Sequence, residues 1–142
     1  MHRDGKPQRL TILGPVPYYD LHKIQVMATT DTGSMEAGYT SYTVLGGDTL
    51  YIELVKVRPE FRRQRIAEYT LFRAVAITGK YRIHTKGLTV AGEKFLSRLA
   101  HAGLLSIEQS SIEQSSFDTT TIFISESGMQ HARMLYNQEQ FG

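Results

Sequence analysis

The sequence predicts a single-domain α/β protein whose central sheet is mixed, mainly antiparallel and built around a β-α-β unit. Three observations lead to this prediction. The 142 residues suit one domain with a core large enough to fold without disulfides. Strand-like segments joined by short turn signals fill the first third of the chain. An apolar segment at 50–57 then leads directly into a helical pattern at 60–78.

The first half of the chain is predicted to form a three-strand antiparallel meander, with strands at 22–30, 35–45 and 50–57. A short strand is expected before it, at 9–13. Gly14, Pro15 and Pro17 should stop the first strand, since proline supplies no N–H to a sheet. Asp31-Thr32-Gly33-Ser34 and Gly46-Gly47-Asp48 are turn signals of the kind that close hairpins.

The second half is predicted to alternate helices and strands. Helices are expected at 60–78 and 91–102, strands at 81–84 and 117–125, and a short helix or tail within 127–142. Pro59 ends the strand at 50–57, and Gly79 suits a helix C-cap. The strand at 81–84 would therefore run parallel to the strand at 50–57, with the helix as crossover. Ser127 is the expected N-cap of the last helix, which would run through Tyr136.

One short internal repeat is present, because SIEQS occurs at 106–110 and again at 111–115. Two copies of this length are too short for a repeat architecture. We therefore interpret 106–116 as a surface loop or hairpin arm, without a ligand site.

Composition narrows the possible chemistry. The chain has no cysteine, which excludes disulfides, thiolate metal sites and cysteine nucleophiles and suits a cytoplasmic protein. No long apolar segment or basic-then-apolar leader is present, so neither a membrane span nor a secretory signal is expected. The five histidines show no metal-ligand spacing, so we expect no metal site.

Positive charge is concentrated at one strand-to-helix junction. The net charge of +2 is too small to predict a nucleic-acid partner. However, five of the 16 lysines and arginines fall within ten positions, namely Lys56, Arg58, Arg62, Arg63 and Arg65. The arginines would lie on or beside the first helical turn, where free N–H groups and the helix dipole favour an anion. The junction is therefore predicted to be a local anion site.

The same junction resembles the signature of a known family. Residues 57–67, VRPEFRRQRIA, are similar to the GNAT superfamily of acyl-CoA-dependent N-acyltransferases. In that signature an apolar strand and Val-x-Pro precede an aromatic residue and Arg/Gln-x-x-Gly-x-Gly/Ala, which opens a long helix. The resemblance covers the element order over most of residues 24–104. It implies a GNAT-like fold and transfer of an acyl group, acetyl in the first place, from acetyl-CoA to an amine of an unidentified acceptor.

The resemblance also implies how coenzyme A would be held. The helix-opening loop of the family wraps the pyrophosphate with backbone N–H groups, which here corresponds to Arg62, Arg63, Gln64, Arg65, Ile66 and Ala67. Val55 and Val57 would pair their backbone with the pantetheine arm, as a sheet edge pairs with a peptide. Arg65 stands where the family usually has its first glycine, and a side chain there narrows the allowed backbone geometry.

Glu53 is the candidate catalytic residue, as the only carboxylate in an otherwise apolar strand. We expect it to be partly buried, with a raised pKa that suits removal of a proton from an amine. By resemblance it would act directly or through water, while a purely structural or salt-bridged glutamate is the alternative. No tyrosine occupies the helix where many family members place a general acid, and nothing in the spacing selects Tyr81 or Tyr136 instead.

Two alternative functions remain open, and the acceptor side can be built in more than one way. The domain could be a catalytically inactive GNAT-like binding or structural protein. Residues 88–105 also resemble part of a winged helix, which would direct the arginines to DNA phosphates. Little room precedes the second strand for the helical pair that shapes the acceptor side in many family members. The acceptor pocket would then be open or completed by a partner subunit, such as a second copy in a homodimer.

Overall fold

The computed structural model describes residues 9–62, 64–86, 89–109, 119–138 and 140–141. Its strands are β1 (Arg9–Tyr18), β2 (Leu21–Thr30), β3 (Gly33–Val44), β4 (Thr49–Val57), β5 (Arg82–Lys86), β6 (Leu105–Gln109), β7 (Thr119–Ile124) and β8 (Gln140–Phe141). Its helices are the 3₁₀ turn η1 (Pro59–Phe61), α1 (Ile66–Thr78), α2 (Val90–His101) and α3 (Glu126–Tyr136). The described residues thus confirm the predicted α/β class.

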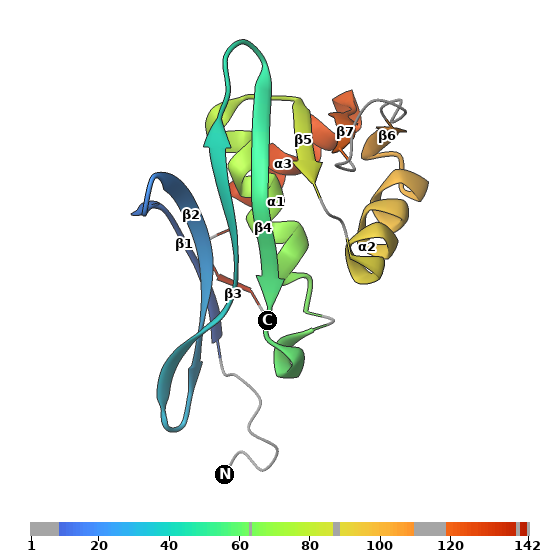
Figure 1. Ribbon diagram of the computed structural model, residues 1–142. Coiled ribbons are helices and arrows are strands. Elements are labelled where there is room, and N and C mark those ends of the chain that lie inside the picture. Colours follow the sequence, from blue (N-terminus) through green and yellow to red (C-terminus); the bar gives the residue numbers. More distant parts are fainter. Residues whose placement is uncertain (1–8, 63, 87–88, 110–118, 139, 142) are drawn as a thin grey trace.

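The strands form one sheet in the order β6-β7-β5-β4-β3-β2-β1-β8 (Figure 1). Among the described strands only β4 and β5 are parallel neighbours, and α1 connects them, so the predicted β-α-β unit is confirmed. All the other paired strands are antiparallel. A winged-helix domain does not contain a mixed sheet of this kind. The winged-helix interpretation of residues 88–105 is therefore wrong.

Helices cover one face of the central strands. α1 and α3 pack together behind β2, β3 and β4, whereas no helix of the described part of the chain crosses the front of these strands (Figure 1). The core lies between the sheet and α1, and its fully buried members include Ile24, Leu50, Phe72 and Val75. Within it the hydroxyls of Thr40 and Thr70 lie 2.8 Å apart, which satisfies two buried polar groups and fixes α1 on β3.

Two expected boundaries in the first half are wrong. β1 continues beyond Leu13 to Tyr18, because its register on β2 shifts between Leu13 and Val16 and Gly14 adopts a φ of +113°. This bulge lets the prolines stay in an outer strand. The helix expected at 60–78 begins only at Ile66, after the 3₁₀ turn η1, so Arg62 and Arg65 lie in the connecting turn before it.

Two expectations for the second half of the chain concern the N-cap of α3 and the SIEQS repeat. Ser125, and not Ser127, caps α3, because its hydroxyl accepts from the N–H of Gly128 at 3.0 Å. The first SIEQS copy lies mainly in β6, whereas the whole second copy and the rest of 110–118 fall outside the described residues. The first copy therefore belongs to β6, an edge strand that pairs antiparallel with β7.

Gly128 allows α3 to pack closely against the backbone just before β6. A Cβ atom on this residue would lie 2.0 Å from the carbonyl oxygen of Leu104. We predict that Gly128→Ala lowers the free energy of unfolding by about 1–3 kcal/mol, since backbone must move to make room. Urea denaturation measures this change. Gly46→Ala is the control, because no atom lies within 4 Å of its added methyl, and equal stability of the two variants would contradict the packing.

Candidate active site

The parallel pair β4 and β5 separates halfway along β4. The two strands pair from Thr49 and Arg82 to Ile52 and Thr85, and the Thr85 hydroxyl donates to the Ile52 carbonyl at 3.2 Å. β4 then continues to Val57 with β3 as its partner. No described strand pairs with the other edge of 53–57, so backbone N–H and C=O groups there are open to a ligand, except the Val57 carbonyl, which accepts from Arg62.

A β-bulge lies at the point of separation. Ile52 is opposite Tyr42 and Leu54 is opposite Ser41, so Glu53 is the extra residue of β4. The side chains of Glu53 and Leu54 are both exposed. The expected partial burial of Glu53 is therefore wrong, because β4 is covered on both sides only in its first half.

A groove of about 1020 Å³ follows the open edge of β4. Its walls come from residues 36–39 of β3, from β4, from η1 and the turn that leads into α1, and from the first turns of α2. Val55, Val57, Arg62, Arg65, Ile66 and Ala67 all line it. The structure therefore brings together six of the residues expected at the cofactor, whereas Gln64 does not line the groove and Arg63 lies outside the described residues.

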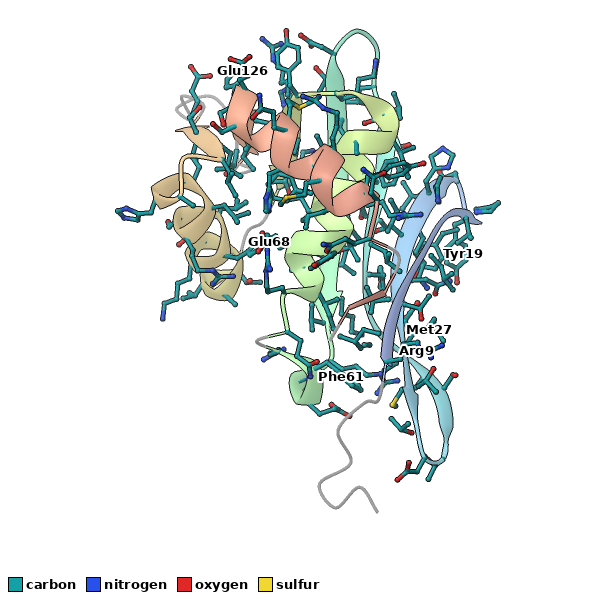
Figure 2. The ribbon with its side chains drawn as sticks, turned by 180° about the vertical axis from the view of Figure 1, so that it is seen from behind. Arg9, Tyr19, Met27, Phe61, Glu68 and Glu126 are labelled. Carbon is teal, nitrogen blue, oxygen red and sulfur yellow. The ribbon has the colours of Figure 1, made fainter. Side chains whose placement is uncertain are left out.

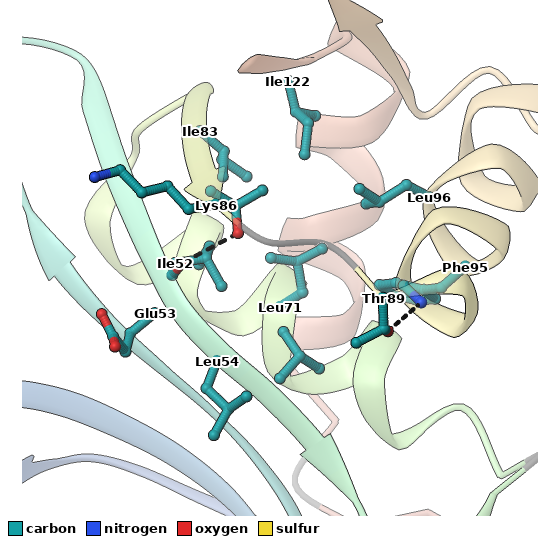
Figure 3. A pocket seen from close by; sticks show the side chains of 13 residues that line it. Ile52, Glu53, Leu54, Leu71, Ile83, Lys86, Thr89, Phe95, Leu96 and Ile122 are labelled. Atoms are coloured by element: carbon teal, nitrogen blue, oxygen red, sulfur yellow. Dashed lines mark hydrogen bonds between the residues drawn. The ribbon is translucent and has the colours of Figure 1, made fainter. Parts of the chain in front are cut away.

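An apolar pocket of about 120 Å³ adjoins the groove where β4 and β5 separate. Ile52, Leu71, Ile83, Leu96 and Ile122 surround its interior (Figure 3). Glu53 and Lys86 also line the pocket, but their charged ends point away from the apolar side chains (Figure 3). Val55 and Phe95 line both spaces, so the pocket continues the groove inward.

The turn before α1 presents positive charge and free amides. Arg65 is the N-cap residue, with φ 65° and ψ 22°, and its side chain makes no capping hydrogen bond. The first-turn N–H groups of α1 have no acceptor within the helix, so they are available to an anion. The guanidinium of Arg58 donates to the carbonyl of Glu36 at 2.8 Å, and Arg62 donates to the carbonyl of Val57 at 3.4 Å.

A buried ion cluster lies beside this turn. Glu68 is 8% exposed and accepts two hydrogen bonds from Arg65, at 2.9 and 3.3 Å. Nε2 of His131 on α3 lies 2.6 Å from the same carboxylate, so it carries the proton of that hydrogen bond. Burial opposes the charged form of Glu68, but the hydrogen bonds and charges of Arg65 and His131 outweigh it and lower its pKa. Figure 2 shows Glu68 on α1.

Sequence reasoning missed the contribution of α2 and the Glu68 cluster. Thr89, Gly92, Phe95 and Arg98 line the groove from α2 and its N-cap. A glycine in the first turn of a helix is a signal of close approach, so Gly92 could have indicated this wall. The pairing of Glu68 with His131 joins residues 63 positions apart and had no local signal.

Neither candidate general acid lies at the site. Tyr81 and Tyr136 are absent from the lining of both the groove and the pocket within the described part of the chain. Tyr81 hydrogen-bonds to Asp48, which raises the pKa of its phenol, and Tyr136 packs under the guanidinium of Arg73. Among the described residues, Tyr39 is the tyrosine that lines the groove. Burial and the hydrogen bond with Tyr18 raise the pKa of Tyr39 to about 12.

Solved structures share this architecture. PaiA N-acetyltransferase from Thermoplasma acidophilum, in complex with coenzyme A, matches with a TM-score of 0.53 and 13% identity, over 75% of this chain and 62% of that chain. Diaminobutyrate acetyltransferase EctA from Paenibacillus lautus, in complex with L-2,4-diaminobutyric acid and coenzyme A, matches with a TM-score of 0.56 and 16% identity. That match covers 72% of this chain and 69% of EctA.

A GNAT-family acetyltransferase from Staphylococcus aureus Mu50 matches with a TM-score of 0.50 and 9% identity, over 74% of this chain and 68% of that chain. No protein-family model and no curated protein matches the sequence. At these identities the likeness shows the fold, which is that of the GNAT superfamily of N-acyltransferases.

The described residues contain no helix that is long and apolar enough to cross a membrane. They also contain no group of three or more His, Asp or Glu side chains placed to hold a metal ion.

The lowered pKa of Glu68 predicts a pH-dependent contribution to stability. Its carboxylate stabilises the fold fully above the unfolded pKa of about 4.3. The contribution is lost as pH falls through the lower folded pKa. Glu68→Gln should therefore cost about 1–3 kcal/mol at neutral pH and progressively less in acid. Urea denaturation across pH tests this, with exposed Glu126→Gln as control; a loss independent of pH would contradict it.

Proposed function

We propose that this protein is an acyl-CoA-dependent N-acyltransferase, with acetyl-CoA as its donor and an amine as its acceptor. One observation carries the proposal. A single groove joins the open edge of β4 to the N-terminus of α1 and continues into an apolar pocket at the point where β4 and β5 separate. A long ligand with an anionic middle and an amide-bearing, apolar arm fits this sequence of surfaces.

The donor set of the turn fits the pyrophosphate of coenzyme A. Arg62 and Arg63 are proposed to hold it through their side chains, and Gln64, Arg65, Ile66 and Ala67 through backbone N–H groups, since the Arg65 guanidinium is paired with Glu68. Arg98 faces the same groove from α2 and adds a cation that the motif does not contain. Charge-assisted hydrogen bonds from guanidinium groups to phosphate are among the stronger ones in proteins.

The open edge of β4 fits the pantetheine arm. Val55 and Val57 line the groove on a strand whose other edge is already paired with β3. Amide groups of the arm would pair with free backbone groups of residues 53–57, as in the addition of a peptide strand. The bound donor supplies a thioester-activated acyl group, for which the small apolar pocket beyond Val55 is the natural space.

Glu53 is proposed as the general base of the site. It lies on the bulge that borders the apolar pocket, and its exposed carboxylate can accept a proton from the acceptor amine directly or through one water. A backbone N–H near Val55 would stabilise negative charge on the acyl oxygen, which is effective because the strand fixes its direction. No side chain is assigned as general acid.

The structural neighbours are consistent with this proposal. PaiA and EctA are N-acetyltransferase and acetyltransferase structures with coenzyme A bound, and EctA also holds an amine substrate. Their identities of 13% and 16% do not carry an acceptor over to this chain.

The first test is binding of acetyl-CoA and coenzyme A by isothermal titration calorimetry. We expect binding by the wild type and an affinity about tenfold or more lower in the Arg62→Ala/Arg63→Ala variant, with little change in melting temperature. Arg133→Ala removes an exposed arginine away from the groove and should bind normally. No binding by the wild type at millimolar ligand would refute the proposed function.

The second test concerns catalysis by Glu53. Glu53→Gln should lower the rate of transfer to a reactive amine by about 10²-fold while leaving acetyl-CoA affinity nearly unchanged, since general bases contribute on this scale. Release of coenzyme A, followed with a thiol reagent, measures the rate, and Glu126→Gln is the matched control. An unchanged rate would remove Glu53 from catalysis. Tight binding of coenzyme A without transfer to any amine in a panel would instead support an inactive binding protein.

A further inference from the structure

The turn that opens α1 contains an unusual backbone position. Arg65 lies in the left-handed region, at φ 65° and ψ 22°, which side chains with a Cβ rarely adopt. Among the described residues only Tyr19 shares a positive φ without being glycine. Something in the structure must therefore favour this conformation of Arg65, because the residue itself does not.

The side chain of Arg65 is held by Glu68, one helical turn along α1. The two groups form a bidentate pair, with Nε on Oε1 at 3.3 Å and Nη2 on Oε2 at 2.9 Å. The guanidinium also lies over the ring of Tyr69, 5.4 Å from its centre. A fork of this kind fixes orientation as well as charge, so it limits where the backbone of Arg65 can go.

Glu68 is itself fixed from the opposite side by α3. His131 contacts its Oε2 at 2.6 Å, and the His131 ring packs edge-on against Phe72 at 5.1 Å. The Glu68 side chain is only 11% exposed, whereas that of Arg65 is 54% exposed. The hydrogen-bonded series of side chains His131, Glu68 and Arg65 therefore leads from a buried contact in the interior to the rim of the groove.

Glu68 also presents a difficulty for anion binding, since it lines the groove beside the helix N-terminus. An unpaired carboxylate there would repel phosphate. Its pairing with Arg65 and His131 offsets this charge, and the same pairing turns Arg65 back along α1 rather than across the first-turn amides.

We propose that Glu68 and His131 are positioning residues for the anion-binding turn. By holding the Arg65 guanidinium they maintain the left-handed backbone that directs the amides of Ile66 and Ala67 into the groove, a task for which a glycine would need no help. The proposal rests on the proposed binding of coenzyme A in the groove. It makes α3, which does not line the groove, a contributor to ligand affinity.

The conformational part can be tested on the free protein. The intraresidue HN–Hα NOE of Arg65 should be strong in the wild type, because these protons approach closely at positive φ. It should weaken in Glu68→Gln and in His131→Phe, whereas Tyr19 supplies an unchanged reference signal in each variant. A strong, unchanged Arg65 signal in Glu68→Gln would overturn the positioning role, and this readout needs no ligand.

The binding part is tested by a double-mutant cycle with coenzyme A. Glu68→Gln should weaken binding by about tenfold in the wild-type background. In the Arg65→Gly background, Glu68→Gln should lower the affinity for coenzyme A by less than about twofold, since glycine adopts the left-handed conformation unaided. Arg65→Gly therefore rescues the defect in affinity, even though melting temperature still falls with loss of the buried carboxylate.

Other outcomes of the cycle count against the proposal in identifiable ways. An equal loss of affinity in both backgrounds would show that Glu68 acts without Arg65. Tighter binding by Glu68→Gln would show that its charge repels the ligand. If neither the wild type nor Arg65→Gly binds coenzyme A, the proposed function fails, and the proposed role of Glu68 in binding fails with it. The NOE still decides whether Glu68 and His131 hold the backbone of Arg65 in its left-handed conformation.

Discussion

The open edge of β4 is the constraint on which the rest of the site depends. Backbone N–H and C=O groups that leave a sheet must find other partners, from solvent or from a ligand. β5 ends at Lys86 while β4 continues to Val57, so this need arises only in the second half of β4. The groove, the bulge at Glu53 and the apolar pocket all lie along that half, and the turn into α1 follows directly from its end.

The electrostatics of the turn combine two requirements that oppose each other. An anion site gains from free amides and guanidinium groups, whereas the packing of α1 against α3 places a carboxylate beside them. A buried carboxylate is tolerated only with hydrogen-bonded partners, and Glu68 has one on each side. Arg65 therefore cannot be treated as a free phosphate ligand, because its guanidinium is shared with the interior of the protein.

Local sequence patterns predicted most of the fold and failed where distant residues decide. The strands β2 and β3 were predicted from the turn signals beside them, and the crossover through α1 from the change of an apolar segment into a helical pattern. The exposure of Glu53 could not be predicted in this way. An apolar strand is covered only as far as its neighbour extends, and the sequence of β4 does not indicate where β5 ends. The prolines of β1 likewise indicated an end, whereas a bulge against β2 absorbed them. The Glu68 cluster depends on α3 and lay beyond any local signal.

The short connection between β1 and β2 determines how open the surface is that an acceptor would meet. Tyr19 and Asp20 form the whole connection, so no helical pair is inserted there. The front of β2, β3 and β4 carries no helix of the described residues, and Glu53 and Leu54 are exposed at the bulge. An acceptor that reaches Glu53 from this side would meet strand side chains on an open surface rather than an enclosed pocket. Its recognition would then depend on contacts spread over that surface, which a large acceptor or a partner subunit supplies more readily than a small amine.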